Sequence, residues 1–158
     1  LFIIICGSYR REKPTSNDID VLIVHPKIKT QEDMIEAHKN LQIYYFYNFI
    51  QYLIKDKFII DKLTEPDVLS KFMGFCKYPD IYRIDIRFMP YDSYYTALLY
   101  FTGSANFNKK MRKQAIKLGY LLSEYGLYKK KTDEQININS ENDVFKHLKM
   151  EYVEPNKR

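Results

Sequence analysis

The sequence is poor in the residues that build zinc sites, disulfide frameworks and membrane spans. It has two cysteines, three histidines and no tryptophan in 158 residues. Cys6 and Cys76 lie in apolar stretches without paired-ligand spacing, which favours buried free thiols in a reducing compartment. The apolar run of residues 1–5 is too short to cross a membrane or to serve as a secretion signal. We therefore expect no Cys/His metal centre, no membrane partner and no secretion.

Glycine is also scarce, with five in the chain, and none belongs to a P-loop, which would end in Gly-Lys-Ser/Thr. This disfavours a P-loop ATPase or GTPase. Gly7-Ser8 nevertheless follows the first apolar run directly, and Arg10-Arg11 come next. Glycine allows close backbone approach, amides at a helix start can point at phosphate oxygens, and Arg11 would neutralise their charge. The segment predicts a phosphate-binding turn, although a Gly-Ser break alone indicates only a turn.

Two carboxylates, Asp18 and Asp20, stand at the head of the second apolar run, and Asp85 lies between Arg83 and Arg87 in another. On a strand, alternate side chains share a face, so Asp18 and Asp20 project together. Three neighbouring carboxylates repel one another unless a cation neutralises them, and hard oxygen ligands suit Mg²⁺. The pattern predicts a metal site for phosphoryl or nucleotidyl transfer. A solvated strand edge is the alternative for any lone Asp-x-Asp.

Basic residues outnumber acidic ones by 25 to 20, which favours an anionic partner but also describes many ordinary proteins. Lys109, Lys113 and Lys117 recur every four residues on one face of a predicted helix, where they could contact a phosphate backbone or simply face solvent. Asn108 and Arg112 are also four apart and could donate to minor-groove acceptors, with ordinary helix-surface polarity as the alternative.

Aromatic residues are abundant, with 15 tyrosines and 10 phenylalanines. The run at residues 44–49 and the pair Tyr100-Phe101 could stack on bases or a sugar. Core packing for the run, and core or hinge packing for the pair, are the more usual roles.

Hydrophobic periodicity predicts an α+β chain: a mixed or antiparallel sheet of about five strands flanked by helices, then a small α/β lobe. The predicted domains are residues 1–90 and 91–158. The predicted order is strand, short helix and strand over residues 1–25, one amphipathic helix over 30–55, strands at 58–60, 69–76 and 81–89, helices at 91–100 and 106–118, short strands near 121–122, 127–128 and 136–138, and a helix from 140.

Several motifs, in this order and spacing, resemble those of the family X DNA polymerases over nearly the whole chain. They are Cys6-Gly7-Ser8-Tyr9-Arg10-Arg11, Asp18-Ile19-Asp20-Val21-Leu22, Arg83-Ile84-Asp85-Ile86-Arg87, Tyr100-Phe101-Thr102-Gly103-Ser104 and Phe107-Asn108-Lys109-Lys110-Met111-Arg112. The resemblance implies a nucleotidyltransferase palm, followed by the lobe that selects the nucleotide and contacts the DNA minor groove. The family's lyase and helix-hairpin-helix regions have no counterpart in these residues.

The resemblance also implies roles for individual residues. Asp18, Asp20 and Asp85 would hold two Mg²⁺ ions, for which Mn²⁺ could substitute, and Arg83 would orient Asp85. Arg87 would exchange Asp20 for Glu124 when the enzyme closes. The implied nucleotide contacts are Gly7, Ser8, Arg11, Asn17, Tyr100, Phe101, Gly103 and Asn108, and the implied DNA-binding or closure residues are Arg87, Lys109, Arg112, Glu124 and Tyr125.

Three positions depart from the family pattern: Glu12 and Asn17 replace glycines, and Ala105 replaces an aspartate. The expected activity is template-directed addition of dNMP to a primer 3′-hydroxyl, in DNA repair gap filling such as base excision repair. The expected partners are primer-template DNA and dNTP, bound by a monomer in the nucleus of a eukaryotic cell, or in the cytoplasm or virion if the source is viral. A terminal or RNA-directed nucleotidyltransferase and a catalytically weakened DNA-binding remnant are the alternatives.

Overall fold

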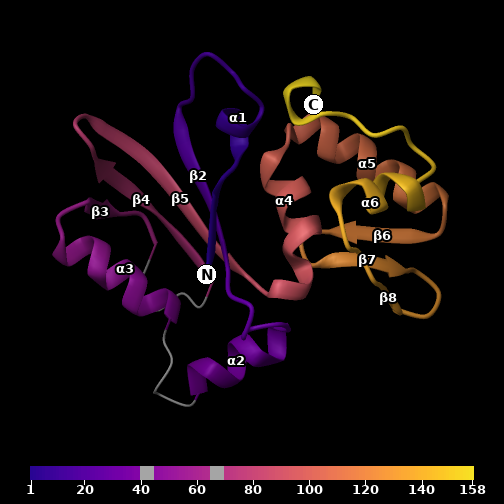
Figure 1. Ribbon diagram of the computed structural model, residues 1–158, viewed down its shortest axis with the longest axis horizontal. Helices are drawn as coiled ribbons and strands as arrows, with labels where there is room; N and C mark the ends of the chain where they lie inside the picture. Colours follow the sequence, from indigo (N-terminus) through magenta and orange to yellow (C-terminus); the bar gives the residue numbers. More distant parts are fainter. Residues whose placement is uncertain (40–44, 65–69) are drawn as a thin grey trace. The chain divides into compact units, whose positions relative to one another are not determined.

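The computed structural model describes residues 1–39, 45–64 and 70–158, and the chain divides into two compact units (Figure 1). The first unit contains Leu1–Ile5 and Ser16–Tyr91, and the second contains Cys6–Thr15 and Asp92–Arg158. The segment Cys6–Thr15 therefore makes its contacts in the second unit, although both sequence neighbours of this segment belong to the first.

The first unit is built on a five-stranded sheet of order β1-β2-β5-β4-β3. Strands β2 and β5 run parallel, and the other neighbours are antiparallel. The predicted sheet of about five strands is confirmed, and of the two predicted arrangements it is the mixed one. The strands are β1 (Phe2–Ile5), β2 (Asp18–Val24), β3 (Ile59–Lys62), β4 (Lys71–Lys77) and β5 (Ile81–Met89).

The single helix predicted over residues 30–55 is wrong, because the structure has two helices in this region. These are α2 (Gln31–Lys39) and α3 (Tyr45–Lys55), and residues 40–44, including Tyr44 of the predicted aromatic run, lie outside the described residues. In α3, Phe46 and Ile50 are buried in the core, whereas Tyr45 and Tyr47 are exposed. The absence of Gly and Pro in a segment shows where a helix is allowed, but it does not show where one helix ends.

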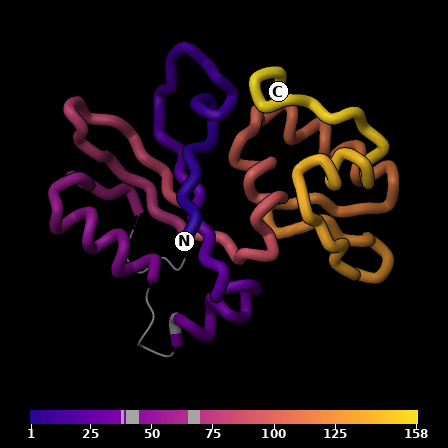
Figure 2. Tube along the Cα trace, in the orientation of Figure 1, coloured from indigo at the N-terminus to yellow at the C-terminus, as the bar shows by residue number. Residues whose placement is uncertain are grey.

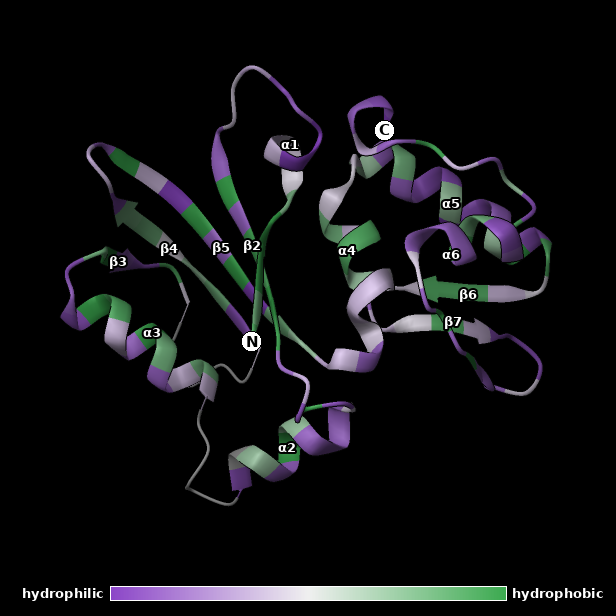
Figure 3. Ribbon diagram, viewed as in Figure 1, coloured by the Kyte–Doolittle hydropathy of each residue, from purple (hydrophilic) through white to green (hydrophobic). Residues whose placement is uncertain are grey.

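The core of the first unit lies on one face of the sheet. Ile84, Ile86 and Phe88 of β5 alternate with the more exposed Arg83, Asp85 and Arg87, and Figure 3 shows this alternation along β5. Side chains of β2 and helix α3 pack on the same core. Since burying one large aliphatic or aromatic side chain contributes about 1.5–3 kcal/mol, this face fixes the register that puts Arg83, Asp85 and Arg87 on the opposite face.

Figure 2 traces the second unit from α4 to the C-terminus. Its elements are α1 (Gly7–Arg10), η1 (Tyr91–Ser93, whose Tyr91 belongs to the first unit), α4 (Tyr94–Thr102), α5 (Ala105–Lys117), β6 (Tyr120–Ser123), β7 (Gly126–Lys129), β8 (Gln135–Ile136), α6 (Glu141–His147) and η2 (Pro155–Lys157). Strands β6, β7 and β8 form an antiparallel sheet. The predicted order of helices and short strands in this region is confirmed.

Local capping explains where these helices begin and end. Gly103 ends α4 at φ +73°, a conformation that favours glycine. The Ser104 hydroxyl accepts a hydrogen bond from the Phe107 amide and caps α5, and Ser140 caps α6 in the same way through Asp143. The core beneath contains Leu99, Phe107, Met111, Ala115, Leu127, Val144, Phe145 and Leu148.

Both cysteines are buried free thiols, as predicted. Among the residues that the structure describes, none of the helices has the length and apolar character needed to cross a membrane.

Candidate active site

Three carboxylates meet on the polar face of the first unit, on strands β2 and β5. The parallel register places Asp20 directly beside Asp85, and Asp18 beside Arg83. One carboxylate oxygen from each of Asp18, Asp20 and Asp85 lies within 4.8 Å of the others, and all three residues are half-buried. The sequence pattern placed Asp18 and Asp20 on one face. Asp85 lies next to them because β5 pairs with β2 in parallel.

Arg83 forms an ion pair with Asp85, one of the three carboxylates. Its Nε and Nη2 each donate to one oxygen of Asp85, both at 3.4 Å. A planar guanidinium that engages both oxygens fixes the rotation of the carboxylate as well as its charge. Arg83 therefore restrains both the position and the rotation of the Asp85 carboxylate.

The donor set fits a magnesium site. Two oxygens bound to one Mg²⁺ at about 2.0–2.1 Å lie about 2.9 Å apart when adjacent and about 4.2 Å apart when opposite. Carboxylate oxygens within 4.8 Å of one another reach these separations with small side-chain adjustments. Hard, anionic oxygen ligands are those that Mg²⁺ and Mn²⁺ prefer over Cys or His.

In the second unit, the predicted phosphate-binding turn forms around α1. Gly7 is buried and has φ +57°, so glycine is needed where the chain enters this turn. The Arg11 Nη1 donates to the Thr102 carbonyl at 2.6 Å and lies 3.1 Å from where a Cβ on Gly103 would sit. Gly103 therefore leaves room for Arg11. The Arg11 Nε is buried and has no hydrogen-bond partner among the described residues.

Glu12, where the family pattern has glycine, adopts φ +57°. This left-handed conformation favours glycine and is strained for glutamate. The Glu12 Oε2 accepts a hydrogen bond from the Asn156 Nδ2 at 3.0 Å. The glutamate at this position therefore forms a hydrogen bond, to a residue near the C-terminus, that a glycine side chain could not form.

Three of the predicted residues, Tyr100, Asn108 and Arg112, line a small open pocket in the second unit. The Asn108 Nδ2 donates to the Tyr100 carbonyl at 2.8 Å, and the Arg112 guanidinium lies 5.0 Å from the centre of the Tyr100 ring. Arg112 also pairs with Glu124 at 3.4 Å. The pocket lining is Thr96, Leu99, Tyr100, Asn108, Met111, Arg112, Leu122 and Ser123.

The remaining predicted residues lie near these clusters or on the surface. Phe101 packs edge-on against Tyr100, with ring centroids 5.0 Å apart. Lys109 is exposed on α5, and the Tyr125 carbonyl accepts a hydrogen bond from the Ser93 hydroxyl at 2.7 Å. Asn17 is exposed just before β2, and Arg87 lies beside Leu22 in the sheet.

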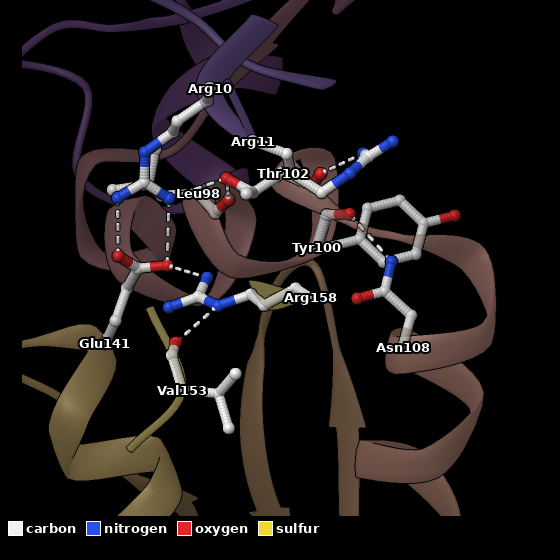
Figure 4. A network of polar contacts seen from close by, with 9 residues as sticks. All are labelled: Arg10, Arg11, Leu98, Tyr100, Thr102, Asn108, Glu141, Val153 and Arg158. Carbon is white, nitrogen blue, oxygen red and sulfur yellow. Dashed lines mark hydrogen bonds and ion pairs between the residues drawn. The ribbon is translucent and has the colours of Figure 1, made fainter. Parts of the chain in front are cut away.

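Sequence reasoning missed a buried ionic network in the second unit. Arg10 and Arg158 both donate to the carboxylate of Glu141, which is 7% exposed (Figure 4). Burial alone would raise the pKa of Glu141, but the hydrogen bonds and charges of both arginines outweigh it and hold that pKa below its ordinary value. No local pattern predicts the network, because Arg10 and Glu141 are 131 residues apart.

The acidic triad on neighbouring parallel strands of a mixed sheet defines a nucleotidyltransferase palm. The family model "DNA polymerase beta palm" matches residues 1–91, and the model "DNA polymerase beta thumb" matches residues 97–158. The chain belongs to the family X DNA polymerases.

Three relatives illustrate the range of the family. DNA polymerase lambda of Rattus norvegicus is 34% identical over 175 residues, covering 100% of this chain and 29% of the rat protein. DNA nucleotidylexotransferases of Gallus gallus and Xenopus laevis are 29% and 27% identical, each over 97% of this chain. The chain spans about a third of the length of these relatives, from 29% to 35%.

Proposed function

We propose that this chain is the catalytic region of a template-directed DNA polymerase that fills gaps during DNA repair. It would add dNMP to a primer 3′-hydroxyl and release pyrophosphate. The observation that supports this most directly is the carboxylate triad on β2 and β5, with its oxygens within 4.8 Å of one another. The proposed domains are a palm over residues 1–90 and a nucleotide-selection and minor-groove lobe over 91–158.

In the first unit, the proposed metal ligands are Asp18, Asp20 and Asp85. Two bound Mg²⁺ ions would activate the attacking primer oxygen and stabilise the charge on the transferred phosphate and on the pyrophosphate. Arg83 holds Asp85 by both oxygens, so the carboxylate is oriented before any ion binds. Such preorganisation lowers the reorganisation needed at the moment of reaction.

The proposed nucleotide contacts belong to both units. They are Gly7, Ser8, Arg11, Tyr100, Phe101, Gly103 and Asn108 of the second unit and Asn17 of the first. Arg11 retains a buried Nε without a partner among the described residues, which suits a cation that binds the triphosphate. Asn17, which belongs to the first unit, would supply a backbone amide.

The pocket residues would contact the nascent base pair. Asn108 and Arg112 are donors, and the minor groove presents acceptors at every base pair regardless of sequence. A protein that must hold DNA without reading it uses contacts of this kind. We propose that Lys109 and Tyr125 assist DNA binding, and that Arg87 exchanges Asp20 for Glu124 on closure. In the structure Glu124 pairs with Arg112.

Primer extension tests the proposal. The protein carrying this region should extend a recessed primer only with the dNTP that pairs with the template base, in the presence of Mg²⁺. Asp85→Ala should abolish incorporation and leave DNA binding largely intact, whereas Asp80→Asn, at an exposed turn, should change neither. Full incorporation by Asp85→Ala would refute the proposed mechanism.

A second candidate is template-independent addition, which is favoured by the two relatives named DNA nucleotidylexotransferase. Single-stranded primers distinguish the two activities. Extension of a single strand without regard to any template would support terminal transfer and would overturn the template-directed reading. Binding of DNA without incorporation in either assay would instead support a catalytically weakened remnant.

The proposed partners are primer-template DNA and dNTP, bound by a monomer. The proposed location follows from the DNA substrate: the nucleus in a eukaryotic cell, and the cytoplasm or virion for a viral protein.

A further inference from the structure

Glu12 brings a negative charge into the segment that contains the proposed phosphate-binding turn. It is the one acidic residue of Cys6–Thr15, whose other charged residues are Arg10, Arg11 and Lys13. The Glu12 side chain is exposed. Within the residues that the structure describes, no cation lies within 4.0 Å of its carboxylate to form an ion pair. The turn therefore has less positive charge than its three basic residues alone would provide.

The backbone places Glu12 beside the residues that we propose bind the triphosphate. The Glu12 amide donates to the Tyr9 carbonyl at 2.9 Å, and the amide of Lys13 donates to the Ser8 carbonyl at 3.1 Å. These two hydrogen bonds fold the chain back on itself, so Glu12 lies in the same turn as Ser8 and directly after Arg11. Because Coulomb interactions extend over such short distances, a charge at this position acts on any anion that the turn binds.

The backbone conformation of Glu12 is unfavourable for a residue with a side chain. Its φ of +57° lies in the left-handed region, which glycine adopts freely and glutamate does not. The shape of the turn therefore does not explain why glutamate is present. Strained residues cluster at binding and catalytic sites, so the strain here points to a function of the Glu12 side chain.

Asn156 restrains the Glu12 carboxylate without neutralising it. The Asn156 Nδ2 in η2 donates to Glu12 Oε2 at 3.0 Å. Because an amide donor is neutral, this hydrogen bond fixes the position of the carboxylate and leaves its charge intact. Without it, the carboxylate would be free to pair with Arg11, its neighbour in the chain, and would then compete with an anionic ligand for that guanidinium.

We propose that Glu12 sets how tightly this turn binds the triphosphate: its charge weakens the attraction, and Asn156 limits the weakening by keeping the carboxylate apart from Arg11. The inference rests on the proposed function, because it takes the triphosphate as the ligand of the turn. It assigns a role in nucleotide affinity to two residues outside the predicted nucleotide contacts. The product pyrophosphate, which is also a polyanion, is expected to respond in the same way.

Glu12→Gln tests the charge alone, because glutamine keeps the side-chain length and an oxygen that accepts from Asn156. In steady-state primer extension at low salt, KM for dNTP should be about threefold lower than in the wild type, with kcat within about twofold. Inorganic pyrophosphate should inhibit this variant at about one third of the wild-type concentration. Both differences should shrink as salt is added, since salt screens exposed charges. An unchanged KM at low salt, or a difference independent of salt, would overturn the proposal.

Asn156→Ala tests the restraint on the carboxylate. In the wild-type background it should raise KM for dNTP by about twofold or more, because the freed carboxylate competes for Arg11. In the Glu12→Gln background the same substitution should leave KM unchanged, since no charge is released there. An equal rise in both backgrounds would show that Asn156 acts through the fold of η2, and would refute its proposed role.

Two further variants separate the local charge from other causes. Glu12→Gly removes the strain together with the charge, so a lower KM in this variant that Glu12→Gln does not share would assign the effect to the backbone and overturn the proposal. Asp133→Asn is the matched control: it removes the same charge in the exposed turn between β7 and β8, where asparagine tolerates the φ of +54°. It should keep the wild-type KM.

The remaining outcomes are also decisive. A fall in KM for Asp133→Asn equal to that for Glu12→Gln would show that only the net charge of the unit matters, and would overturn the proposal. Absence of incorporation by the wild-type protein would instead refute the proposed function.

Discussion

The two units differ in charge more than the whole chain suggests. The first unit has 10 basic and 11 acidic residues, whereas the second has 15 basic and 9 acidic residues. The net charge of +5 therefore comes entirely from the second unit. A metal site needs concentrated acids and a polyanionic ligand needs cations, so the difference indicates a division of labour. Under the proposed function, the first unit would carry the chemistry and the second would bind nucleotide and DNA.

The largest expected effect would come from the first unit. Asp20→Asn removes a negative ligand from the proposed metal site, and kcat should fall by a factor of about 10³ or more, because the attacking oxygen loses its activation. DNA affinity, measured by fluorescence anisotropy, should change less than twofold. A large loss of DNA affinity with kcat preserved would contradict the division of labour.

Core substitutions compare the stability of the two units. Phe72→Ala in the first unit and Phe145→Ala in the second each empty a fully buried site, and each should destabilise its own unit by about 3–5 kcal/mol. Thermal unfolding followed by hydrogen exchange would assign the loss of protection to one unit or to both. Equal loss in both units from either variant would show that they unfold as one cooperative body.

A smaller effect is expected from the basic helix. Arg112→Ala should weaken DNA binding by about 1–3 kcal/mol, since it removes a donor from the proposed minor-groove contact. Lys113→Gln should weaken binding less than Arg112→Ala, and it should lower the salt dependence of binding by about one unit of slope. Binding isotherms at several salt concentrations distinguish the two. An Arg112→Ala variant with wild-type affinity would restrict the DNA contacts to other parts of the chain.

The smallest effect concerns acid stability of the second unit. The arginines that face Glu141 hold its pKa below the ordinary value in the folded state, so ionised Glu141 stabilises the fold at neutral pH. This contribution is present above the unfolded pKa, about 4.3, and is lost as the pH falls through the folded pKa. Asp143, whose pKa is lowered mainly by the Asn139 amide, acts in the same direction.

Urea unfolding at several pH values would measure this contribution. Relative to the wild type, Glu141→Gln should be less stable at pH 7, and the difference between them should shrink as the pH falls below about 4. A constant difference across this range would show that Glu141 is not ionised in the folded protein.

The sequence predicted the elements well where the pattern is local. Strict alternation in 81–89 identified the core face of β5 from Ile84 and Ile86, and Ser140 identified the start of α6. The position of Asp85 beside Asp20 was harder to predict, because the alternation of side chains shows which face of a strand is buried but not which strand lies next to it in the sheet. The resemblance to the polymerase family supplied that neighbour.

Two features lay beyond local patterns. The single helix predicted over residues 30–55 is two helices in the structure. The prediction rested on the amphipathic spacing within α3, and that spacing carries no information about the more hydrophilic α2 before it. The buried ionic network of Arg10, Glu141 and Arg158 joins residues that are far apart in sequence. In the sequence alone these charged residues look like ordinary surface residues, because charged side chains are rarely buried without a partner. Such networks are visible only in the fold.

The placement of Glu141 has a consequence for synthesis of the chain. Arg10 is made 131 residues before its partner, whereas strands β1 and β2, which flank its segment, are adjacent in the sheet and are complete early. At a translation rate of about 5–20 residues per second, synthesis of Glu141 follows that of Arg10 by about 7–26 seconds. The turn can therefore acquire its final contacts only after α6 has been made.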